Sequence, residues 1–336
     1  METNKNKLVW WKKLLIGVGG FFGSLIVTVF TVIGGLNILK FAIYPEYYSI
    51  RTLVCHNSGT HSGYMTQGTA ISDDGKYIIT SGYMKDNTNS RIYITEIETN
   101  IATSCMLLPA DEGPSKGKEV NRMHFGGVAI KGDTIYVASD DSVHTVSLKE
   151  ALVNDELKMN YLMSVNSQAS FIDCDEQYLY VGEFYDLEHN YKTNNKITYN
   201  NKEYNAIVEK YSFDDLETCL EVYAIRDEVQ GFAVNDKGDM LLSCSYGLTS
   251  SYFYFYNKDS IVNTNTTYEK ADNAPLYVLE NHDKLLIGPA MAEDLDYYNG
   301  KFYTNFESAS NKYIFGKFFI SADKIVALDF SKYETK

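Results

Sequence analysis

The sequence predicts an all-β domain, a five-bladed β-propeller, preceded by one transmembrane helix. Three observations lead to this prediction: an uncharged apolar segment near the N-terminus, the scarcity of helical periodicity after it, and a strand–turn–strand pattern that recurs five times. Recurrence of this kind is the sequence signature of propellers and other repeat architectures. The chain has 336 residues, a length that an all-β fold can use as a single unit.

The apolar segment spans residues 14–39 and contains 26 residues without a formal charge. At about 1.5 Å per residue it would form roughly 39 Å of helix, which exceeds a hydrocarbon core of about 30 Å. Trp10, Trp11 and Tyr44 flank it, as aromatic residues do at membrane interfaces. We therefore expect a transmembrane anchor at residues 14–41.

The distribution of positive charge predicts the orientation of this anchor. Residues 1–45 contain five Lys and one Glu, and four of the lysines precede the span. The positive-inside rule then places residues 1–13 in the cytoplasm and a domain of residues 46–336 outside a cell membrane that the chain crosses once. A cleaved signal peptide is the alternative, but its apolar region would run only about 7–15 residues before a small-residue cleavage site, and residues 37–40 offer no such site.

Five segments of the domain share the order strand, tight turn, strand. They are residues 67–79, 125–137, 168–181, 230–242 and 293–303. The first and fourth copies both begin with Gln-Gly and place a Gly in the turn. Asp74-Gly75 and Asn299-Gly300 are typical hairpin turns, because the backbone there needs positive φ.

Further strands follow several copies, which gives the four strands of a propeller blade. We expect these outer strands at residues 91–97 with 102–108, 206–211 with 219–223, and 251–256 with 276–280. Only one clear strand, at residues 324–330, follows the last copy, so residues 48–55 are expected to complete its sheet and close the ring. A six-bladed propeller with an additional blade in residues 272–290 is the alternative.

The first turn is flanked by Met65-Thr66-Gln67-Gly68, Ser81-Gly82-Tyr83 and Ser90-Arg91-Ile92-Tyr93. Together these residues resemble the first blade of bacterial and plant-type glutamine cyclotransferases, five-bladed propellers that cyclise N-terminal glutamine. That family places a catalytic Glu on the second strand just before Ser-Thr-Gly, whereas Ile79-Thr80-Ser81-Gly82 contains no acid. The other copies resemble membrane-anchored propellers of the NHL and gluconolactonase-like type. The resemblance implies the propeller fold, and it does not transfer an activity.

A ring of polar residues is expected at one mouth of the central channel. Gln67, His124, Gln168 and Gln230 each stand eight residues before the second position of their turn, and Glu293 stands seven before it. Equivalent positions of the blades lie at equivalent heights around the axis, so these side chains would surround one mouth and could bind a polar ligand or a cation. Hydrogen bonding between neighbouring blades is the alternative role.

The ends of the second strands add acidic and aromatic residues, namely Tyr83, Asp140, Glu183, Tyr185, Tyr246 and Glu307. If they approach the same mouth, the site would suit a cation, an amine or a hydroxyl-rich glycan, whereas an ordinary solvated rim is the alternative. Three further acidic pairs, Asp73-Asp74, Asp140-Asp141 and Asp294 with Asp296, do not match a calcium-binding loop. We interpret them as turn residues, where Asp is favoured.

The sequence therefore predicts a membrane-tethered, extracytoplasmic binding module for a small ligand, a wall glycan or an envelope protein. It predicts no catalytic residue, cofactor or metal site, because it contains no C-x-x-C pair, phosphate-binding loop or nucleophile elbow. The net charge of −14 argues against a nucleic acid partner, whose phosphates need a basic patch. A channel-sited enzyme, either cyclotransferase-like or a metal-assisted lactonase or hydrolase, is the alternative function.

Overall fold

The computed structural model describes residues 2–86, 88–114, 116–117, 124–313 and 322–334, and it contains five sheets of four to six strands. Blade 1 contains β2 (Tyr64–Ile71), β3 (Tyr77–Met84), β4 (Arg91–Glu96), β5 (Ala102–Leu108) and β9 (Glu156–Lys158). Blade 2 contains β6 (Gly127–Lys131), β7 (Thr134–Ser139), β8 (Ser142–Ser147) and β10 (Asn160–Ser164). Blade 3 contains β11 (Phe171–Cys174), β12 (Tyr178–Gly182), β15 (Ala206–Ser212), β16 (Asp215–Ile225), β21 (Ala274–Val278) and β20 (Val262–Tyr268).

The last two blades complete the set. Blade 4 contains β17 (Val229–Val234), β18 (Met240–Cys244), β19 (Ser251–Tyr256) and β22 (Lys284–Gly288). Blade 5 contains β23 (Ala292–Tyr298), β24 (Lys301–Phe306), β25 (Lys324–Leu328) and β1 (Arg51–His56). Shorter elements lie between or beside these strands: η1 (Thr60–Ser62), α3 (Leu148–Ala151), β13 (Ile197–Tyr199), β14 (Lys202–Tyr204), η3 (Lys258–Ser260) and η4 (Glu307–Ala309).

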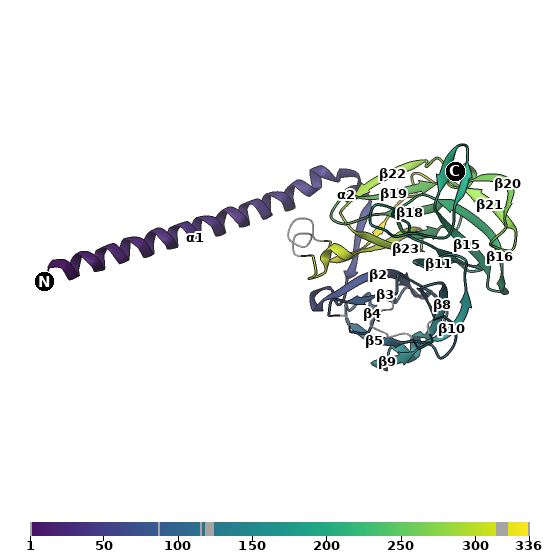
Figure 1. Cartoon of the computed structure of the whole chain (residues 1–336), viewed down its shortest axis with the longest axis horizontal. Coiled ribbons are helices and arrows are strands. Elements are labelled where there is room, and N and C mark those ends of the chain that lie inside the picture. The colour runs from purple at the N-terminus through teal and green to yellow at the C-terminus, as the bar shows by residue number, and fades with distance from the viewer. Residues whose placement is uncertain (1, 87, 115, 118–123, 314–321, 335–336) are drawn as a thin grey trace.

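The innermost strands close into a ring, in which β2, β6, β11, β17 and β23 each contact the next and β23 contacts β2 again. Figure 1 shows β2, β11 and β23 at the centre and the outer strands β9, β20 and β22 at the periphery. The ring is tight, because a Cβ atom added at Gly127 would lie 2.5 Å from the backbone nitrogen of Ile172, and one at Gly231 would lie 2.5 Å from the Cα of Asp294. The five-bladed prediction is confirmed.

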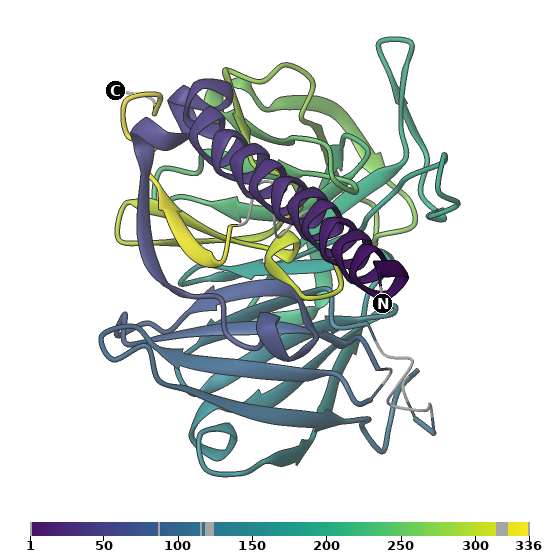
Figure 2. The ribbon, with the colours of Figure 1, turned by 90° about the vertical axis from the view of Figure 1, so that its left-hand side faces the viewer.

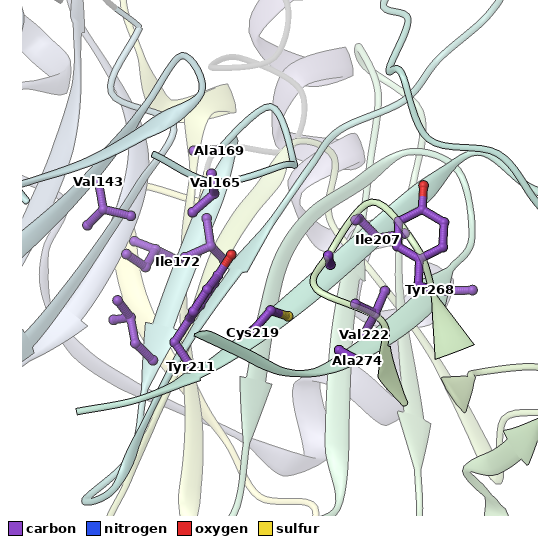
Figure 3. Packing of buried hydrophobic residues seen from close by; sticks show 14 of the residues in the cluster. Val143, Val165, Ala169, Ile172, Ile207, Tyr211, Cys219, Val222, Tyr268 and Ala274 are labelled. Atoms are coloured by element: carbon purple, nitrogen blue, oxygen red, sulfur yellow. The ribbon is translucent and has the colours of Figure 1, made fainter. Parts of the chain in front are cut away.

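One apolar cluster lies between each pair of neighbouring blades. Successive side chains of a strand point to opposite faces of its sheet, so Ile78 packs toward blade 5 and Ile79 toward blade 2. Figure 3 shows the cluster between blades 2 and 3, where Val143 and Ile172 approach Tyr211. Both faces of each blade are therefore buried.

The ring closes as expected, with the N-terminal strand β1 pairing antiparallel to β25. Residues 48–50 belong not to this strand but to α2 (Pro45–Ile50), a short helix that begins with Pro, the residue favoured at a first helical position. Tyr47 of α2 is 1% exposed and packs among residues of blades 4 and 5. An ion pair of 2.7 Å between Glu46 Oε2 and Lys284 Nζ fixes the same helix to β22.

Within the described residues, one helix is long and apolar enough to cross a membrane: α1 (Glu2–Ile43), whose segment Val9–Ile43 contains an 18-residue stretch with a mean hydropathy of 2.2. The propeller buries none of its apolar stretch. In Figure 1 this helix leaves the rim of the propeller beside α2 and projects away from it, and Figure 2 shows it in front of the blades.

One outer strand was assigned to the wrong blade. The sequence predicts residues 276–280 as the fourth strand of blade 4, but β21 pairs parallel to β16 in blade 3. The fourth strand of blade 4 is β22, which pairs with β19. Residues 272–290 are thus shared between blades 3 and 4 and form no sixth blade. The physical reason is the length of β16, which has 11 residues and offers an edge on which the β20–β21 hairpin can extend the sheet.

Candidate functional site

The five residues of the predicted ring all lie where the innermost strands begin. Gln67, Gln230 and Glu293 each stand at a point where the register with the following strand shifts. His124 and Gln168 lie three residues before β6 and β11. A bulge re-aims the side chain that it carries, so a common position along the strands does not by itself bring the five side chains together.

Four of the predicted site residues form one group where blades 5, 1 and 2 meet. The Tyr83 hydroxyl donates a hydrogen bond of 3.1 Å to Glu307 Oε1, and the ring centroids of Tyr83 and His124 are 5.1 Å apart. Glu307 lies in η4, and its backbone N–H donates to the carbonyl of Met291, two residues before Glu293. Strand ends from three blades thus bring these side chains together.

Two residues of the loop after β24 complete this group, and the sequence analysis did not find them. Lys312 Nζ donates a hydrogen bond of 2.8 Å to the Tyr83 hydroxyl and lies 4.9 Å from the centroid of that ring. The same ammonium lies 5.1 Å from the ring of Tyr313, whose hydroxyl bonds to Glu307. We refer to Tyr83, His124, Glu293, Glu307, Lys312 and Tyr313 as the acidic–aromatic cluster.

The two carboxyl groups of the acidic–aromatic cluster are buried. Glu293 is 3% exposed and forms no hydrogen bond with any described residue. Burial, followed by the negative charge of Glu307, raises the pKa of Glu293 well above its usual range. Burial also raises the pKa of Glu307 to about 7, although the Lys312 charge opposes that rise. Two buried carboxyl groups close to each other are costly unless their charge is compensated, which suits a place for a ligand.

The surrounding protein, followed by the positive charge of Lys312, lowers the pKa of His124 to about 4, although the residue is exposed. Its imidazole ring lies 5.1 Å from the ring of Tyr83 and is tilted by 39° to it, so His124 contributes an aromatic wall to the cluster.

Glu183, Gln168 and Tyr185 lie in a separate network of blade 3. Both oxygens of Glu183 are used: Oε1 accepts from Asn195 Nδ2 (2.8 Å) and from the backbone N–H of Ile207 (3.2 Å), and Oε2 accepts from the backbone N–H of Gln168 (3.1 Å). Burial raises the pKa of Glu183 to about 7. The backbone carbonyl of Tyr185 accepts a hydrogen bond from the backbone N–H of Glu228, and Tyr185 packs against the apolar cluster between blades 3 and 4. Glu183 thus holds the insertion of residues 184–205 in place.

The amide groups of the remaining two predicted residues bond to nearby backbone carbonyls. Gln67 Nε2 donates to the carbonyl of Thr66 (3.0 Å), and Gln230 Nε2 donates to that of Ser245 (3.3 Å). Both bonds lie within a single blade, so they are not the bonds between neighbouring blades that the sequence left open as the alternative role.

Asp294 lies within β23 and is fully buried, so its assignment to a turn is wrong. Its Oδ2 accepts hydrogen bonds of 3.4 Å from the backbone N–H groups of both Thr69 and Val128. These N–H groups belong to the innermost strands of blades 1 and 2, whose inner edges lack a further strand to pair with. The carboxylate supplies the missing acceptor and links three blades.

Asp173 and Asp296 form a second link across the axis. Asp296 Oδ2 accepts a hydrogen bond of 2.6 Å from the backbone N–H of Ile71, and Asp173 Oδ2 accepts one of 3.1 Å from that of Val234. The two carboxyl groups also hydrogen-bond to each other, which requires that they share a proton. Burial raises the pKa of Asp296 to about 7 and that of Asp173 well above its usual range. Asp296, like Asp294, is therefore no turn residue.

The arrangement of acids and cysteines gives no metal site or disulfide in the described part of the chain. No group of three or more His, Cys, Asp or Glu residues there is placed to hold a metal ion. All five cysteines are free, and four of them are buried.

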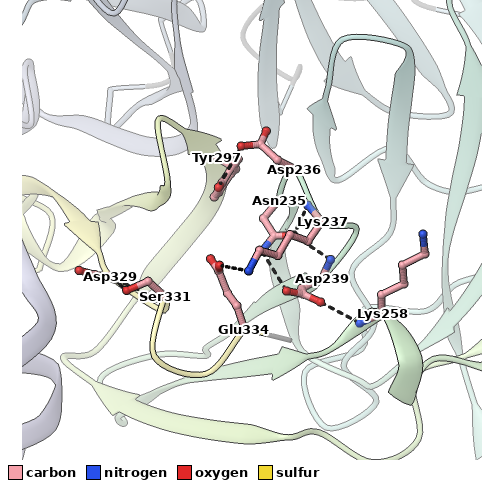
Figure 4. Close-up of polar contacts among 9 residues, drawn as sticks. All are labelled: Asn235, Asp236, Lys237, Asp239, Lys258, Tyr297, Asp329, Ser331 and Glu334. Carbon is pink, nitrogen blue, oxygen red and sulfur yellow. Dashed lines mark hydrogen bonds and ion pairs between the residues drawn. The ribbon is translucent and has the colours of Figure 1, made fainter. Parts of the chain in front are cut away.

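A cavity of about 870 Å³ opens at the other end of the innermost strands, opposite the acidic–aromatic cluster. The turns between the first and second strands of blades 1, 3, 4 and 5 line it together with the end of β6 in blade 2, and we refer to it as the turn-end cavity. Figure 4 shows part of its border, where the Tyr297 hydroxyl donates a hydrogen bond of 3.3 Å to Asp236. No residue that lines this cavity belongs to the site predicted from the sequence, which was placed at the opposite mouth of the channel.

Comparisons with known proteins identify no family for this chain. No family model matches the chain, and no curated protein does. Among solved structures, the chain is similar to a PQQ-bound aldose sugar dehydrogenase from Streptomyces coelicolor, with a TM-score of 0.40, 12% identity, and coverage of 76% of this chain and 77% of that one. It is also similar to the WD40 repeats of RRP9, with a TM-score of 0.38, 12% identity and 78% coverage of both chains.

Proposed function

We propose that this chain is a membrane-tethered binding protein whose propeller lies outside the cell and binds a cationic amine at the acidic–aromatic cluster. The observation that carries the proposal is Glu293, a buried carboxyl group without a hydrogen-bond partner among the described residues, beside a second buried carboxyl group, Glu307. An ammonium group would supply both charge and hydrogen-bond donors to this pair.

The side chain of Lys312 supports the choice of an amine. Its ammonium already lies over the rings of Tyr83 and Tyr313 and donates to a tyrosine hydroxyl. Cation–π attraction of this kind is the usual way in which aromatic cages recognise ammonium groups. Since Lys312 is exposed and bonds to Tyr83 rather than to Glu293, it leaves the deeper carboxyl group available.

A titration with cadaverine and with 1,5-pentanediol, its neutral analogue, tests this function. We expect the full chain in lipid nanodiscs to bind cadaverine and not the diol, measured by isothermal titration calorimetry. Glu293→Gln should weaken cadaverine binding by about tenfold or more, since a charge-assisted hydrogen bond contributes about 1.5–3 kcal/mol. The affinity should rise from pH 6 to pH 8, because Glu307, with a pKa of about 7, must lose its proton to pair with the cation.

The control is Glu269→Gln, the same chemical change at an exposed position of β20–β21, which should leave the affinity unchanged. Lys312→Met should strengthen binding, because it removes the chain's own ammonium from the two rings. Equal affinity for cadaverine and pentanediol, or an unchanged affinity in Glu293→Gln, would refute the proposed site.

The membrane orientation predicts which positions a membrane-impermeant maleimide reaches in intact spheroplasts. A cysteine in place of Asp214, an exposed residue of the β15–β16 turn, should be labelled directly. A cysteine in place of Thr3 should be labelled only after the membrane is permeabilised, since four lysines lie on that side of the span. The chain without either substitution is the control, because four of its five cysteines are buried. The reverse pattern of labelling would place the propeller in the cytoplasm.

An enzyme at the same position is the second candidate function. It is favoured by one observation, the proximity of Glu293 and Glu307 with raised pKa values, which suits general acid–base chemistry near neutral pH. A cyclotransferase-like reaction would release ammonia from peptides with N-terminal glutamine, and a lactonase would consume a lactone. Release of ammonia or consumption of a lactone by the full chain, together with the loss of that reaction in Glu293→Gln, would favour the enzyme over the binding protein.

A further inference from the structure

The turn-end cavity is large enough for a ligand of its own. Its volume of about 870 Å³ lies within the range of roughly 300–1,000 Å³ that is usual for small-molecule sites. Ile71, Ile130, Val234 and Asp296 line it at the ends of the innermost strands, and it continues outward between blades 3 and 4. The acidic–aromatic cluster lies at the other end of these strands, and none of its residues lines this cavity.

Tyrosine rings form the wall of the cavity that belongs to blade 3. Four tyrosines contribute: Tyr178, Tyr180, Tyr223 and Tyr277. The rings of Tyr223 and Tyr277 are stacked, with centroids 5.4 Å apart and an interplanar angle of 27°. The hydroxyl of Tyr180 donates a hydrogen bond of 3.0 Å to Asp175, and that of Tyr223 donates to Glu221. These bonds hold the rings in place, so the wall presents fixed aromatic faces beside carboxylate oxygens.

Two lysines that line the cavity have partners within the protein. Lys210 Nζ lies 2.9 Å from Glu221 Oε2 and 4.0 Å from the ring centroid of Tyr178. Lys131 Nζ donates to the backbone carbonyl of Glu176. A ligand that binds through the charge of Lys210 or Glu221 would therefore have to break an existing ion pair.

The opposite wall, from blades 4 and 5, has the same character. Figure 4 shows Lys237 paired with Glu334 (3.1 Å) and the Tyr297 hydroxyl bonded to Asp236. Asp236 is exposed and lines the cavity, so its carboxylate can accept further hydrogen bonds. The two walls together offer aromatic faces, hydrogen-bond acceptors and hydrogen-bond donors, and two of their lysines, Lys210 and Lys237, are paired with carboxylates.

We propose that the turn-end cavity is a second binding site, and that it takes a neutral saccharide segment. A sugar presents apolar C–H faces that pack on tyrosine rings and hydroxyl groups that both donate and accept hydrogen bonds, which matches the two walls. This site does not depend on the proposed amine site, since the two use different residues at opposite ends of the channel.

Calorimetry with defined tetrasaccharides tests the proposal on the full chain in lipid nanodiscs. The probes are cellotetraose, maltotetraose and N-acetylchitotetraose, with tetragalacturonic acid as their acidic counterpart. We expect one of the neutral probes to bind. Tyr277→Ala, which removes the stacked outer ring, should weaken that binding by about tenfold, and Asp236→Ala should weaken it by a similar factor through a lost hydrogen bond.

Glu293→Gln is the matched control at the opposite mouth and should leave saccharide binding unchanged, while Tyr277→Ala should leave cadaverine binding unchanged. If Tyr277→Ala does not fold, Asp236→Ala, an exposed position, decides the result. The proposal is overturned if none of the neutral probes binds, if the variants that fold bind the neutral probe as well as the unaltered chain does, or if tetragalacturonic acid binds as tightly.

Discussion

Deleting residues 44–56 is expected to abolish cooperative folding of the propeller. This segment supplies α2 and the closing strand β1, whose residues Arg51 and Leu53 pair with Leu328 and Val326 of β25. Without it the outer edge of β25 is unpaired, and the ring has an open seam in blade 5. The apolar cluster between blades 4 and 5 also loses the buried ring of Tyr47.

Thermal unfolding followed by far-ultraviolet circular dichroism measures this effect. Fluorescence of tryptophan is unsuitable, because both tryptophans lie in α1, at Trp10 and Trp11. Two substitutions in this segment distinguish the contribution of side-chain packing to stability from the contribution of strand pairing. Tyr47→Ala should lower the free energy of unfolding by about 3–5 kcal/mol, as large-to-small changes of buried aromatic residues do. Leu53→Ala is the control, since Leu53 is 52% exposed and should change stability by less than about 0.5 kcal/mol.

A deletion variant that unfolds cooperatively at the same temperature as the unaltered chain would contradict this account. It would mean that blade 5 is complete with three strands and that β1 only connects the anchor to the domain. An equal loss of stability in Leu53→Ala and Tyr47→Ala would likewise contradict the assigned burial.

The number of blades could be predicted because the innermost hairpins repeat in sequence. Their turns carry residues that tolerate positive φ, such as Asn299 and Gly300, with φ of 48° and 78°. The outer strands do not repeat as clearly, and sequence order is a poor guide at a sheet edge, where a strand can join either neighbouring blade. That is why residues 276–280 were expected in blade 4, although β21 extends blade 3 beside β16.

The candidate site could be predicted only where it follows the repeat. Tyr83, His124, Glu293 and Glu307 stand at strand ends in successive blades, and four of the nine predicted residues meet there. Lys312 belongs to the loop after β24, outside the strand–turn–strand pattern that repeats between the blades, so no register pointed to it. Bulges in β2 and β17 also turned Gln67 and Gln230 toward internal hydrogen bonds.

The aspartates of the axis were misread for a different physical reason. Asp is common in turns, and Asp294 and Asp296 stand close before the turn at Asn299 and Gly300. Their actual role depends on backbone N–H groups of other blades that face the axis, such as that of Ile71, more than 200 residues away in sequence. No local pattern contains this requirement, because it arises only when the ring closes.

The shared proton of Asp173 and Asp296 should make the propeller less stable as the pH rises above neutrality. Both groups have raised pKa values in the folded chain, and the nearby charges of Asp294 and Asp73 add to the effect of burial. Between their unfolded and folded pKa values, the folded state binds more protons than the unfolded state. The free energy of unfolding then falls with pH, by up to about 1.4 kcal/mol per pH unit for each such group.

Further buried groups must be considered in choosing the pH window. His124 has a lowered pKa in the folded state, so it opposes the fall in stability below its unfolded pKa of about 6.5 and not above it. The raised pKa values of other buried carboxyl groups act in the same direction as those of the aspartates; these groups are Glu183, Glu293, Asp294 and Glu307. Measured between pH 6.5 and 8, the midpoint of thermal unfolding should therefore fall by roughly 5 °C, given about 2–4 °C per kcal/mol for a domain of this size.

Asp173→Asn should reduce the fall of the thermal unfolding midpoint with pH, and it should make the propeller more stable than the unaltered chain at pH 8. The amide oxygen can still accept from the backbone N–H of Val234, and the amide nitrogen can donate to Asp296, which then carries its charge without a shared proton. Asp214→Asn, the same change at an exposed turn, should leave both the slope and the midpoint unchanged. If Asp173→Asn keeps the full slope, or is less stable at pH 8, then the pair does not share a proton and another buried carboxyl group, with Glu293 the first to test, sets the pH dependence. Because Asp173 and Asp296 lie on blades 3 and 5 and bond to blades 4 and 1, the pH at which they lose their proton would also be the pH at which the ring loosens at its centre.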